Sequence, residues 1–480
     1  MDTINLLELL VTFLWKLTYF GSIFFIILVI LLENRSPVKT MAWVLLIWFL
    51  PVIGILFYVL FGRDTRKTRL ISRKMLSRLR KHPMAEFQEQ SAVELPPSVV
   101  RIADFFSASN RALTFDGNHI DIFTSGYDFL QALLREIKQA RRYIHLQYYI
   151  FDDDPVGRLV RDMLIDKARE GVEIKVLYDD VGCWHTKQHF FDEMEKHGIE
   201  VCSFLKVVFP LLTGKVNYRN HRKMTIIDGQ VGFVGGMNLA VRYLRSIPQA
   251  PGVWRDTHLL IRGKGVYGLQ TSFLLDWYFV SRTLLTSRHY FPVMPQMGNS
   301  IVQVVTADPV SPWKGIMQGL TMAIHRARNY FYIQTPYFLP TEPILTALQT
   351  AALSGVDVRL MLPARSDARI VALATDSYLK DVLRAGVKVY LYQKGFLHSK
   401  LMVGDDILCT VGSTNMDFRS FEHNFEVNAF MYDTPTALRM KQIFLADQQE
   451  CTPLYLKHWE QRPRMRRVAE SVVRLLSPLL

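Results

Sequence analysis

Cysteine is scarce in this chain of 480 residues. None of the four cysteines belongs to a CxxC motif or to a Cys/His ligand pattern, which excludes a metal site or a redox motif built on cysteine. On the cytosolic side of a membrane disulfides are rare. We therefore expect buried or reduced thiols at Cys183, Cys202, Cys409 and Cys451.

Groups that suit a divalent metal are also few. The acidic groups 152–154 and 179–180 follow predicted strands and precede Pro or Gly, which is typical of loops and helix caps. His185 and His189 have helical spacing but no third ligand. We expect no metal and no other cofactor, because metal-assisted chemistry needs clustered ligands.

The first apolar run has neither the basic start nor the small-residue cleavage site of a signal peptide. Leu17 to Leu32 carries no charge and can extend back to Leu9, long enough to cross ~30 Å of hydrocarbon. A second uncharged run covers Thr40 to Gly62, and Pro51 should kink it. We predict a two-helix transmembrane hairpin over residues 1–62, in preference to a buried hairpin of a soluble core.

Positive charge is concentrated directly after this hairpin. Arg63 to His82 holds nine Lys or Arg against one acid, Asp64, a net +8 of the chain's +13. Such a run is often only a solvated linker, but beside a membrane span it is also the positive-inside signal. It predicts that the rest of the chain faces the cytoplasm, and that the basic run is attracted to anionic headgroups by ~1 kcal/mol per basic residue. We assign residues 63–110 to this basic segment and to a Pro-containing connector.

One pattern, His-x-Lys-x4-Asp-x6-Gly-x2-Asn, occurs twice. The first copy comprises His221, Lys223, Asp228, Gly235 and Asn238, and the second His398, Lys400, Asp405, Gly412 and Asn415. Each copy supplies an imidazole, a fixed positive charge, and amide and backbone donors. Two copies that face each other would make a site for phosphodiester chemistry without a metal.

The repeat extends upstream of the motif, as an internal duplication should. Gly171–Leu177 matches Gly355–Met361, and four earlier residues also pair: Ala140, Arg141, Tyr143 and Gln147 with Ala327, Arg328, Tyr330 and Gln334. Strands and helices alternate in both copies, which indicates an α/β fold with mostly parallel sheets. We predict a first half over 111–298 and a second over 299–480. Strands are expected at 143–151, 172–178, 200–205, 330–335, 357–362 and 387–392, and helices at 156–170, 188–197, 343–354 and 368–385.

The doubled motif resembles that of the phospholipase D superfamily, over roughly Arg111 to Ala446. More narrowly, the chain resembles bacterial cardiolipin synthases. This resemblance is carried by the two apolar segments together with Asn220-His221-Arg222-Lys223, Trp254-Arg255-Asp256-Thr257 and Ser477-Pro478-Leu479-Leu480. The resemblance implies two tandem phospholipase D-like α/β/α sandwich halves about a pseudo-two-fold, with the active site between them. It also implies phosphatidyl transfer between two phosphatidylglycerol molecules, which gives cardiolipin and glycerol through a phosphohistidine, in a multi-pass protein of the bacterial inner membrane.

The residue types suggest how the work would be divided. Lys223 and Lys400 would neutralise the charge of the phosphate. Hydrogen bonds to the phosphate oxygens would come from Asn238, Asn415 and Ser413. The glycines would let the backbone approach the phosphate closely: Gly235, Gly236 and Gly412. One imidazole would attack phosphorus while the other transfers protons. The symmetry of the motifs does not say which; the resemblance favours His221 as nucleophile and His398 as acid/base.

Each imidazole also needs a carboxylate that fixes its tautomer. Glu426, 28 residues after His398, resembles the family's downstream carboxylate, and Asp256, 35 residues after His221, is the candidate for the first copy. Asp228 and Asp405 belong to the motif and are included with the catalytic set. Since each closes a strand before Gly or Asp, a turn-stabilising role is the alternative.

Other functions fit parts of the same pattern. Attack of water on the phosphohistidine would make a phospholipase D, and another donor lipid, such as phosphatidylethanolamine, would make a different transferase. A nuclease is disfavoured by the apolar segments and by the absence of a basic-aromatic run, so no nucleic acid is expected. A non-enzymatic phosphate-binding membrane scaffold is disfavoured because both His-Lys pairs are intact. The stretch Arg464 to Leu480 is either an interfacial amphipathic helix or an ordinary docked one.

Overall fold

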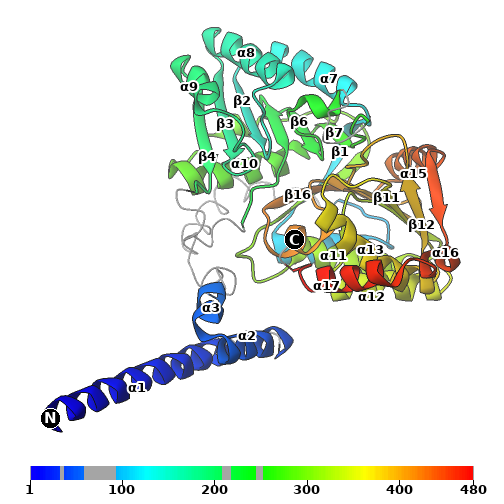
Figure 1. The fold of residues 1–480 in the computed structure, drawn as a ribbon. Coiled ribbons are helices and arrows are strands. Elements are labelled where there is room, and N and C mark those ends of the chain that lie inside the picture. Colours follow the sequence, from blue (N-terminus) through cyan, green and yellow to red (C-terminus); the bar gives the residue numbers. More distant parts are fainter. Residues whose placement is uncertain (1, 33–36, 59–92, 208–217, 245–251, 479–480) are drawn as a thin grey trace. The chain divides into compact units, whose positions relative to one another are not determined.

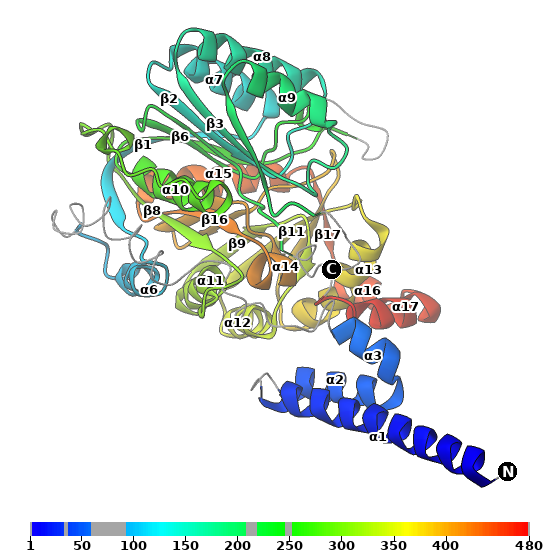
Figure 2. The same ribbon diagram turned by 90° about the vertical axis from the view of Figure 1, so that its left-hand side faces the viewer.

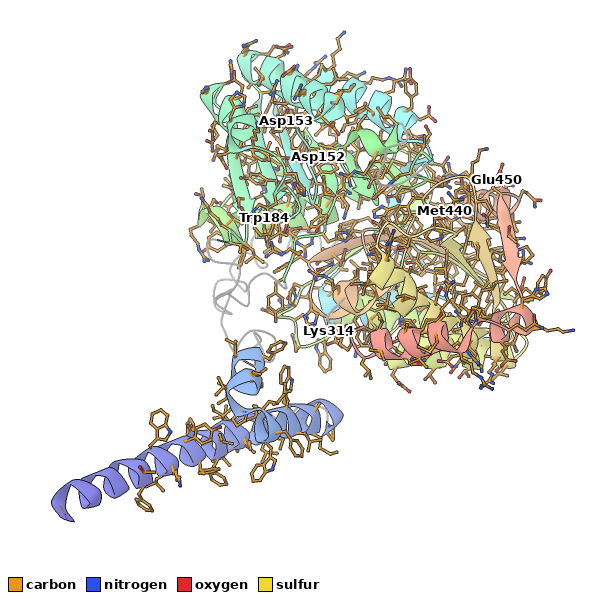
Figure 3. All side chains as sticks on the ribbon, viewed as in Figure 1. Asp152, Asp153, Trp184, Lys314, Met440 and Glu450 are labelled. Carbon is orange, nitrogen blue, oxygen red and sulfur yellow. The ribbon has the colours of Figure 1, made fainter. Side chains whose placement is uncertain are left out.

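Apolar helices open the chain. The structure, a computed structural model, describes residues 2–32, 37–58, 93–207, 218–244 and 252–478. Helix α1 covers Asp2–Leu32, and its stretch Trp15–Leu32 is long and apolar enough to cross a membrane. Large apolar side chains project from it into solvent (Figure 3). Among the described helices it alone meets that length and composition, since α2 offers only the shorter Thr40–Phe49.

The second expected span is divided at Pro51. Helix α2 (Pro37–Phe49) ends before Leu50, whose φ of −132° and ψ of 68° are not helical, and α3 (Pro51–Phe57) follows. Proline lacks a backbone N–H and sterically blocks the preceding helical turn, so the predicted kink is confirmed. A second continuous membrane-spanning helix is not confirmed. Gly62 and the basic segment, with most of the connector behind it, lie outside the described residues.

The catalytic motifs lie in an α/β unit whose strands form one fifteen-stranded sheet (Figures 1 and 2). Its order is β17-β12-β11-β9-β13-β14-β16-β8-β1-β7-β6-β5-β2-β3-β4, so each sequence half contributes a continuous block. The blocks meet where β1 pairs antiparallel with β8. The first block contains β1 (Thr114–Phe123), β2 (Tyr143–Tyr148), β3 (Glu173–Asp179), β4 (Glu200–Phe204), β5 (Met224–Ile227), β6 (Val231–Gly235) and β7 (His258–Arg262).

The second block repeats this arrangement and adds an edge strand, β17. It contains β8 (Ser300–Ala307), β9 (Tyr330–Gln334), β11 (Asp357–Pro363), β12 (Lys388–Tyr392), β13 (Leu401–Gly404), β14 (Leu408–Gly412), β16 (Glu426–Met431) and β17 (Cys451–Leu454). A separate two-stranded sheet joins β10 (Phe338–Leu339) to β15 (Met416–Asp417). Within the two halves, every predicted strand and helix is found, with ends shifted by a few residues at most.

Helices cover both faces of each block. Outer helices pack on the first block through one core cluster and on the second through another, while α10 and α15 share a third cluster with strands of both blocks. The helices are α6 (Val100–Asn110), α7 (Gly126–Gln139), α8 (Pro155–Arg169), α9 (Gln188–Lys196), α10 (Val266–Ser281), α11 (Gly315–Arg326), α12 (Glu342–Leu353), α13 (Arg369–Arg384), α14 (Phe418–Glu422), α15 (Thr434–Gln448), α16 (Leu456–Glu460) and α17 (Arg464–Arg474). The duplicated α/β/α fold is therefore confirmed.

The prediction of mostly parallel sheets is wrong for the strands that carry the motifs. Within the fifteen-stranded sheet only β2-β3-β4 and β9-β11-β12 are parallel, and the remaining neighbours are antiparallel. The reason is connection length: Ile227 and Val231 are joined by a short turn, and a parallel pair needs a crossover of a dozen residues or more.

The motif aspartates hold the start of a neighbouring strand. The Asp228 carboxylate accepts from the backbone N–H groups of Arg141, Arg142 and Tyr143, at 2.9, 2.8 and 2.9 Å. Asp405 does the same for Arg328, Asn329 and Tyr330, at 2.7, 2.8 and 3.0 Å. Both adopt the left-handed backbone, with φ of 53° and 51°, which aspartate tolerates better than most residues. These contacts support the turn-stabilising alternative, and neither residue lines the cavity described below.

Candidate active site

The backbone of each motif histidine is bound by the opposite half of the sequence. The His221 N–H donates to the Phe425 carbonyl at 2.9 Å, and the Phe425 N–H donates to Arg219 at 2.8 Å. In the second half, the His398 N–H donates to the Arg255 carbonyl at 2.7 Å, and the Arg255 N–H donates to Phe396 at 2.9 Å. This pair of backbone hydrogen bonds between the halves thus occurs twice with the same residue offsets. In each case the residue from the opposite half, Phe425 or Arg255, is followed by a carboxylate residue, Glu426 or Asp256.

The two carboxylates reach across the halves. His221 Nδ1 lies 3.1 Å from both oxygens of Glu426, and His398 Nδ1 lies 2.6 Å from Asp256 Oδ2. This corrects the expected pairing of each histidine with a carboxylate of its own copy. A carboxylate only accepts, so each Nδ1 carries the proton and each Nε2 is left with its lone pair. Separation along the chain cannot reveal such pairing, because closure of the two blocks decides it.

Glu426 and Asp256 are held by different neighbours. Glu426 accepts from the Ser413 hydroxyl and, at 3.1 Å, from Asn424 Nδ2, whereas Asp256 accepts from the Thr257 N–H at 2.7 Å. At Gly236, the counterpart of Ser413, an added Cβ would lie 2.1 Å from Asp256 Oδ1. Ser413 therefore holds one carboxylate, and Gly236 makes room for the other. Their expected contacts with the phosphate stay predictions.

The motif glycines pack against the next strand. A Cβ at Gly235 would lie 2.6 Å from the Thr257 carbonyl oxygen, and one at Gly412 would lie 2.3 Å from that of Val427. Such distances exclude any larger residue unless the backbone shifts. These glycines are required by strand packing beside the two carboxylates, and their expected role in admitting a phosphate stays a prediction.

Each lysine is buried and tied to the histidine of its own motif. Lys223 Nζ donates to the His221 carbonyl at 2.6 Å, and Lys400 Nζ donates to the His398 carbonyl. Burial lowers the pKa of Lys223 well below its usual range and that of Lys400 to about 8. Asp256 and Glu426 oppose this by favouring the charged form of Lys400. The ammonium groups are therefore poorly solvated and attractive to an anion.

Both imidazoles are driven toward the neutral form. Burial lowers the pKa of His221 to about 4, although Glu426 raises it in part. Burial, followed by the charges of Lys400 and Lys223, lowers the pKa of His398 well below its usual value. Each ring also contacts an aromatic ring, Tyr149 for His221 and Trp254 for His398, both at 4.9 Å between centroids. At neutral pH two uncharged imidazoles face the cavity.

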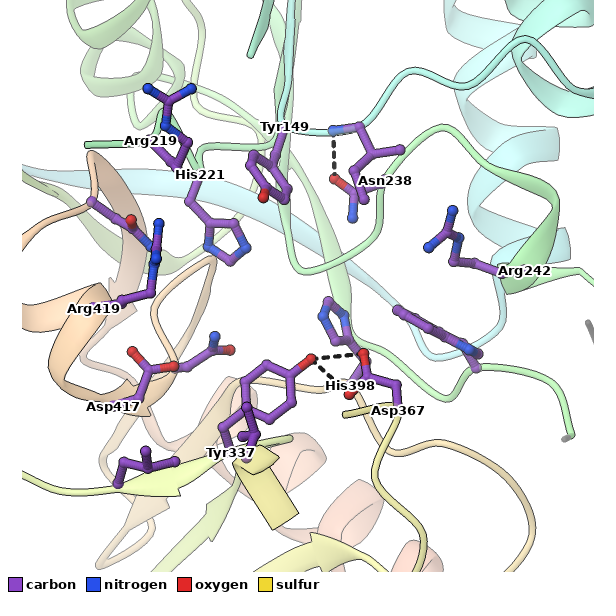
Figure 4. A pocket seen from close by; sticks show the side chains of 16 residues that line it. Tyr149, Arg219, His221, Asn238, Arg242, Tyr337, Asp367, His398, Asp417 and Arg419 are labelled. Carbon is purple, nitrogen blue, oxygen red and sulfur yellow. Dashed lines mark hydrogen bonds between the residues drawn. The ribbon is translucent and has the colours of Figure 1, made fainter. Parts of the chain in front are cut away.

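One cavity of about 320 Å³ is lined by predicted residues from both copies (Figure 4), although Lys223 and Lys400 are not among its lining residues. His221, Asn238, His398 and Asn415 all line it. Asn238 is already engaged, accepting from the Ile150 N–H at 3.1 Å and donating to the Tyr243 hydroxyl at 2.9 Å. Asn415 Oδ1 is buried and has no hydrogen-bond partner among the described residues, so it offers an acceptor to a bound molecule.

Sequence reasoning missed several residues of the cavity wall. They are Tyr149, Arg219, Arg242, Trp254, Tyr337, Asp367, Asp417 and Arg419. Arg242 pairs with Asp152 at 2.8 Å (Asp152 is labelled in Figure 3), and the Tyr337 hydroxyl donates to Asp367 at 2.9 Å. Arg219, two residues before His221, could have been found from its position next to the motif. Arg242 and Arg419 occupy equivalent positions, each four residues after its motif asparagine, so the repeat could have indicated them, whereas Asp367 lies outside the repeated pattern and gave no signal.

Comparison with known proteins agrees with this geometry. A family model described as "Cardiolipin synthase, PLD-like domain" matches residues 133–249 and 320–448, and one described as "Phospholipase_D-nuclease N-terminal" matches 21–63. The cardiolipin synthase of Geobacillus sp. (strain WCH70) is 42% identical over 469 residues, covering 96% of this chain and 92% of the relative. The major cardiolipin synthase of Bacillus subtilis (strain 168) is 40% identical over 477 residues, covering 97% of this chain and 99% of the relative.

A solved structure shares the fold at low sequence identity. Phosphatidylserine synthase from Haemophilus influenzae Rd KW20 superposes with a TM-score of 0.62 at 14% identity, over 79% of this chain and 99% of that one. At that identity the likeness concerns the fold alone. Family matches to both halves, relatives similar over nearly the full length and the paired His-Lys motifs point the same way: the chain belongs to the cardiolipin synthase family of phospholipase D-like proteins.

Proposed function

We propose that this chain joins two phosphatidylglycerol molecules into cardiolipin and releases glycerol, through a phosphatidyl-histidine intermediate. The observation that carries the proposal is the single buried cavity lined by His221 and His398, each bound to a carboxylate from the opposite half. Membership of the cardiolipin synthase family supports the choice of substrates.

In the first step, His221 Nε2 attacks phosphorus and the bond from phosphorus to the glycerol oxygen breaks. Protonated His398 gives its proton to the departing glycerol. In the second step, neutral His398 takes the proton from a headgroup hydroxyl of the second phosphatidylglycerol, whose oxygen attacks phosphorus and breaks the P–N bond. His398 ends protonated again, so the cycle closes.

The two environments favour this division of roles. His221 faces both Glu426 oxygens, which compensate the positive charge that the ring gains as it attacks. His398 sits close to Lys400 as well as Asp256, with Lys400 Nζ 2.8 Å from His398 Nδ1. A nearby ammonium makes protonated His398 a stronger acid, which suits a proton donor. An anionic phosphate between the rings offsets the lysine charges and lets His398 take up its proton on binding.

The membrane placement is also part of the proposal. Helix α1 would anchor the chain in a bacterial inner membrane, with the divided second segment completing a multi-pass anchor. The α/β unit would face the cytoplasm, an orientation that rests on the basic sequence 63–82. The four cysteines are free, which suits that compartment.

We further propose that Arg419 binds the phosphate of the accepting lipid. Cardiolipin holds two phosphates joined by one glycerol, so the acceptor's phosphate must lie a short distance from the reacting phosphorus. Arg419 lines the cavity beside His221 and, within the described part of the chain, forms no ion pair or side-chain hydrogen bond (Figure 4). Arg242, by contrast, is occupied by Asp152.

The products identify the reaction. The purified full-length chain, incubated with phosphatidylglycerol, should form cardiolipin and free glycerol in equal amounts, measured by mass spectrometry of the lipids and an assay for glycerol. Phosphatidic acid as the main product would show a hydrolase, and no turnover would show a scaffold. Adding phosphatidylethanolamine tests the donor, because release of ethanolamine would show that this lipid is used.

Removing each histidine should separate the two roles. His398→Ala should slow turnover by roughly 10²- to 10⁴-fold, the usual contribution of a general acid or base, and should leave a phosphatidyl group on His221. His221→Ala should form no adduct. Peptide mass spectrometry after an alkaline quench locates the adduct, and His189→Ala, which changes an exposed histidine on α9, is the matched control. An adduct on His398 in the His221→Ala variant would reverse the assignment.

Activity should fall on the alkaline side through Lys400. With a pKa of about 8 in the empty site, Lys400 is charged below that pH and neutral above it. kcat/KM should therefore decrease as pH rises through about 8, while kcat changes less, because bound phosphate keeps the lysine protonated. Lys400→Arg should abolish this decrease while lowering overall activity, since arginine stays charged. A kcat/KM that stays level through about pH 10 contradicts the assignment.

Replacing Arg419 should weaken the acceptor step selectively. Arg419→Gln removes charge-assisted hydrogen bonds of about 1.5–3 kcal/mol, so kcat/KM for cardiolipin formation should fall roughly 10- to 100-fold. Exchange of labelled glycerol into phosphatidylglycerol needs no accepting lipid and should change far less. Arg419→Lys, which keeps the charge, is the conservative control. Equal loss in both assays would refute an acceptor site at Arg419.

A further inference from the structure

Helix α17 is docked in the reverse of the usual orientation, with its polar face inward. It packs on α13, and two of its arginines pair with aspartates of that helix: Arg466 with Asp376 at 2.8 Å and Arg474 with Asp381 at 2.9 Å. Glu470 is almost fully buried and binds Arg462 at 2.5 Å and Arg466 at 3.3 Å. Ion pairs to α13 therefore fix the helix to the α/β unit.

The opposite face of α17 is apolar and exposed. Met465, Val468, Val472 and Leu475 follow one another at the spacing of a single helix face and are 79%, 56%, 58% and 80% exposed. A docked terminal helix normally buries such a stripe. A contiguous exposed apolar face on an otherwise well-packed unit marks a surface that is covered by something else.

Basic residues border this stripe. Arg464 and Arg467, with Val468, Ser471, Val472 and Leu475, line a shallow groove along the helix. Within the described residues Arg464 is exposed, and neither Arg464 nor Arg467 forms an ion pair. The arginines used for docking, Arg466 and Arg474, are on the other side. Positive charge at the edge of the apolar stripe is thus available to a bound partner.

We propose that this face of α17 lies on a bilayer of anionic phospholipid. Met465, Val468, Val472 and Leu475 would enter the acyl boundary, and Arg464 and Arg467 would contact lipid phosphates, as in interfacial amphipathic helices. A second copy of the chain fits less well, because a two-fold contact through this face would bring the same arginines together. The ordinary docked helix and the interfacial helix, which the sequence left as alternatives, are combined here: the polar face docks and the apolar face meets lipid.

A fluorescent probe at Val472 tests this contact directly. Val472→Cys in the full chain, labelled with an environment-sensitive dye and reconstituted in phosphatidylglycerol vesicles, should emit at shorter wavelength and be quenched at least twofold by lipids with a quencher on the acyl chain. Leu353→Cys, at an equally apolar and exposed site on α12, is the matched control and should be quenched little. The parent chain measures label on the native cysteines.

The lipid and salt dependence complete the test. Quenching at Val472 should weaken in phosphatidylcholine vesicles and at high salt, because the arginines contribute through charge. Equal quenching at both sites overturns the proposal, and so does a blue shift in detergent that grows with protein concentration, which would show a second copy instead. No turnover is measured, so the outcome is independent of the proposed transfer reaction.

Kinetics on surfaces give a second measurement. Val472→Glu should lower the rate at least fivefold on vesicles in which phosphatidylglycerol is diluted, and leave the rate on detergent-dispersed short-chain phosphatidylglycerol within twofold of the parent. Leu353→Glu, the matched charge change, should affect neither assay. Equal rates for Val472→Glu and the parent on vesicles would contradict a role of this face at the membrane.

Discussion

The site depends on carboxylates that each half supplies to the other. Glu426 fixes His221 and Asp256 fixes His398, and the backbone hydrogen bonds beside them cross in the same way. Neither half alone contains a histidine with its own carboxylate. Opening the interface would separate each histidine from the carboxylate that fixes its tautomer. The active geometry and the closed arrangement of the halves are thus one structural state.

Charge balance in this buried space connects binding to chemistry. Lys223 and Lys400 lie near Asp256 and Glu426, whose charges oppose the effect of burial on the lysine pKa values, and burial keeps both imidazoles neutral. A phosphodiester adds one negative charge in a medium that screens it poorly, so one added proton on an imidazole becomes favourable. The acid needed for the leaving glycerol would therefore form when substrate arrives. Without substrate both imidazoles are neutral, so the empty site holds no protonated histidine that could give its proton to water.

Much of this architecture could be predicted from the sequence, because local patterns determine it. Periodicity placed the strands and helices, and the identical motif spacing placed His221 and His398 at equivalent positions. The pairing of carboxylates could not be predicted, since the closure of two blocks sets it, and neither could the parts of Ser413 and Gly236, which depend on side-chain packing. Asp367 belongs to no repeated pattern, whereas Arg419 repeats Arg242 at the same distance from its motif and could have been predicted. The antiparallel pairing of the strands around the motifs follows from the short connections between them. The alternation of strands and helices elsewhere in each half did not indicate this pairing.

The small departures from symmetry are where the two copies have specialised. Glutamate reaches His221 with both oxygens at 3.1 Å and is itself held by Ser413 and Asn424, whereas the shorter aspartate meets His398 at 2.6 Å through one oxygen and requires a glycine at 236. A symmetric pair of identical histidines would have equal affinity for the proton and no preferred direction for its transfer. Unequal carboxylates, with one lysine closer to its imidazole than the other, remove that equality. A duplicated motif can in this way yield one nucleophile and one acid without any change in the motif itself.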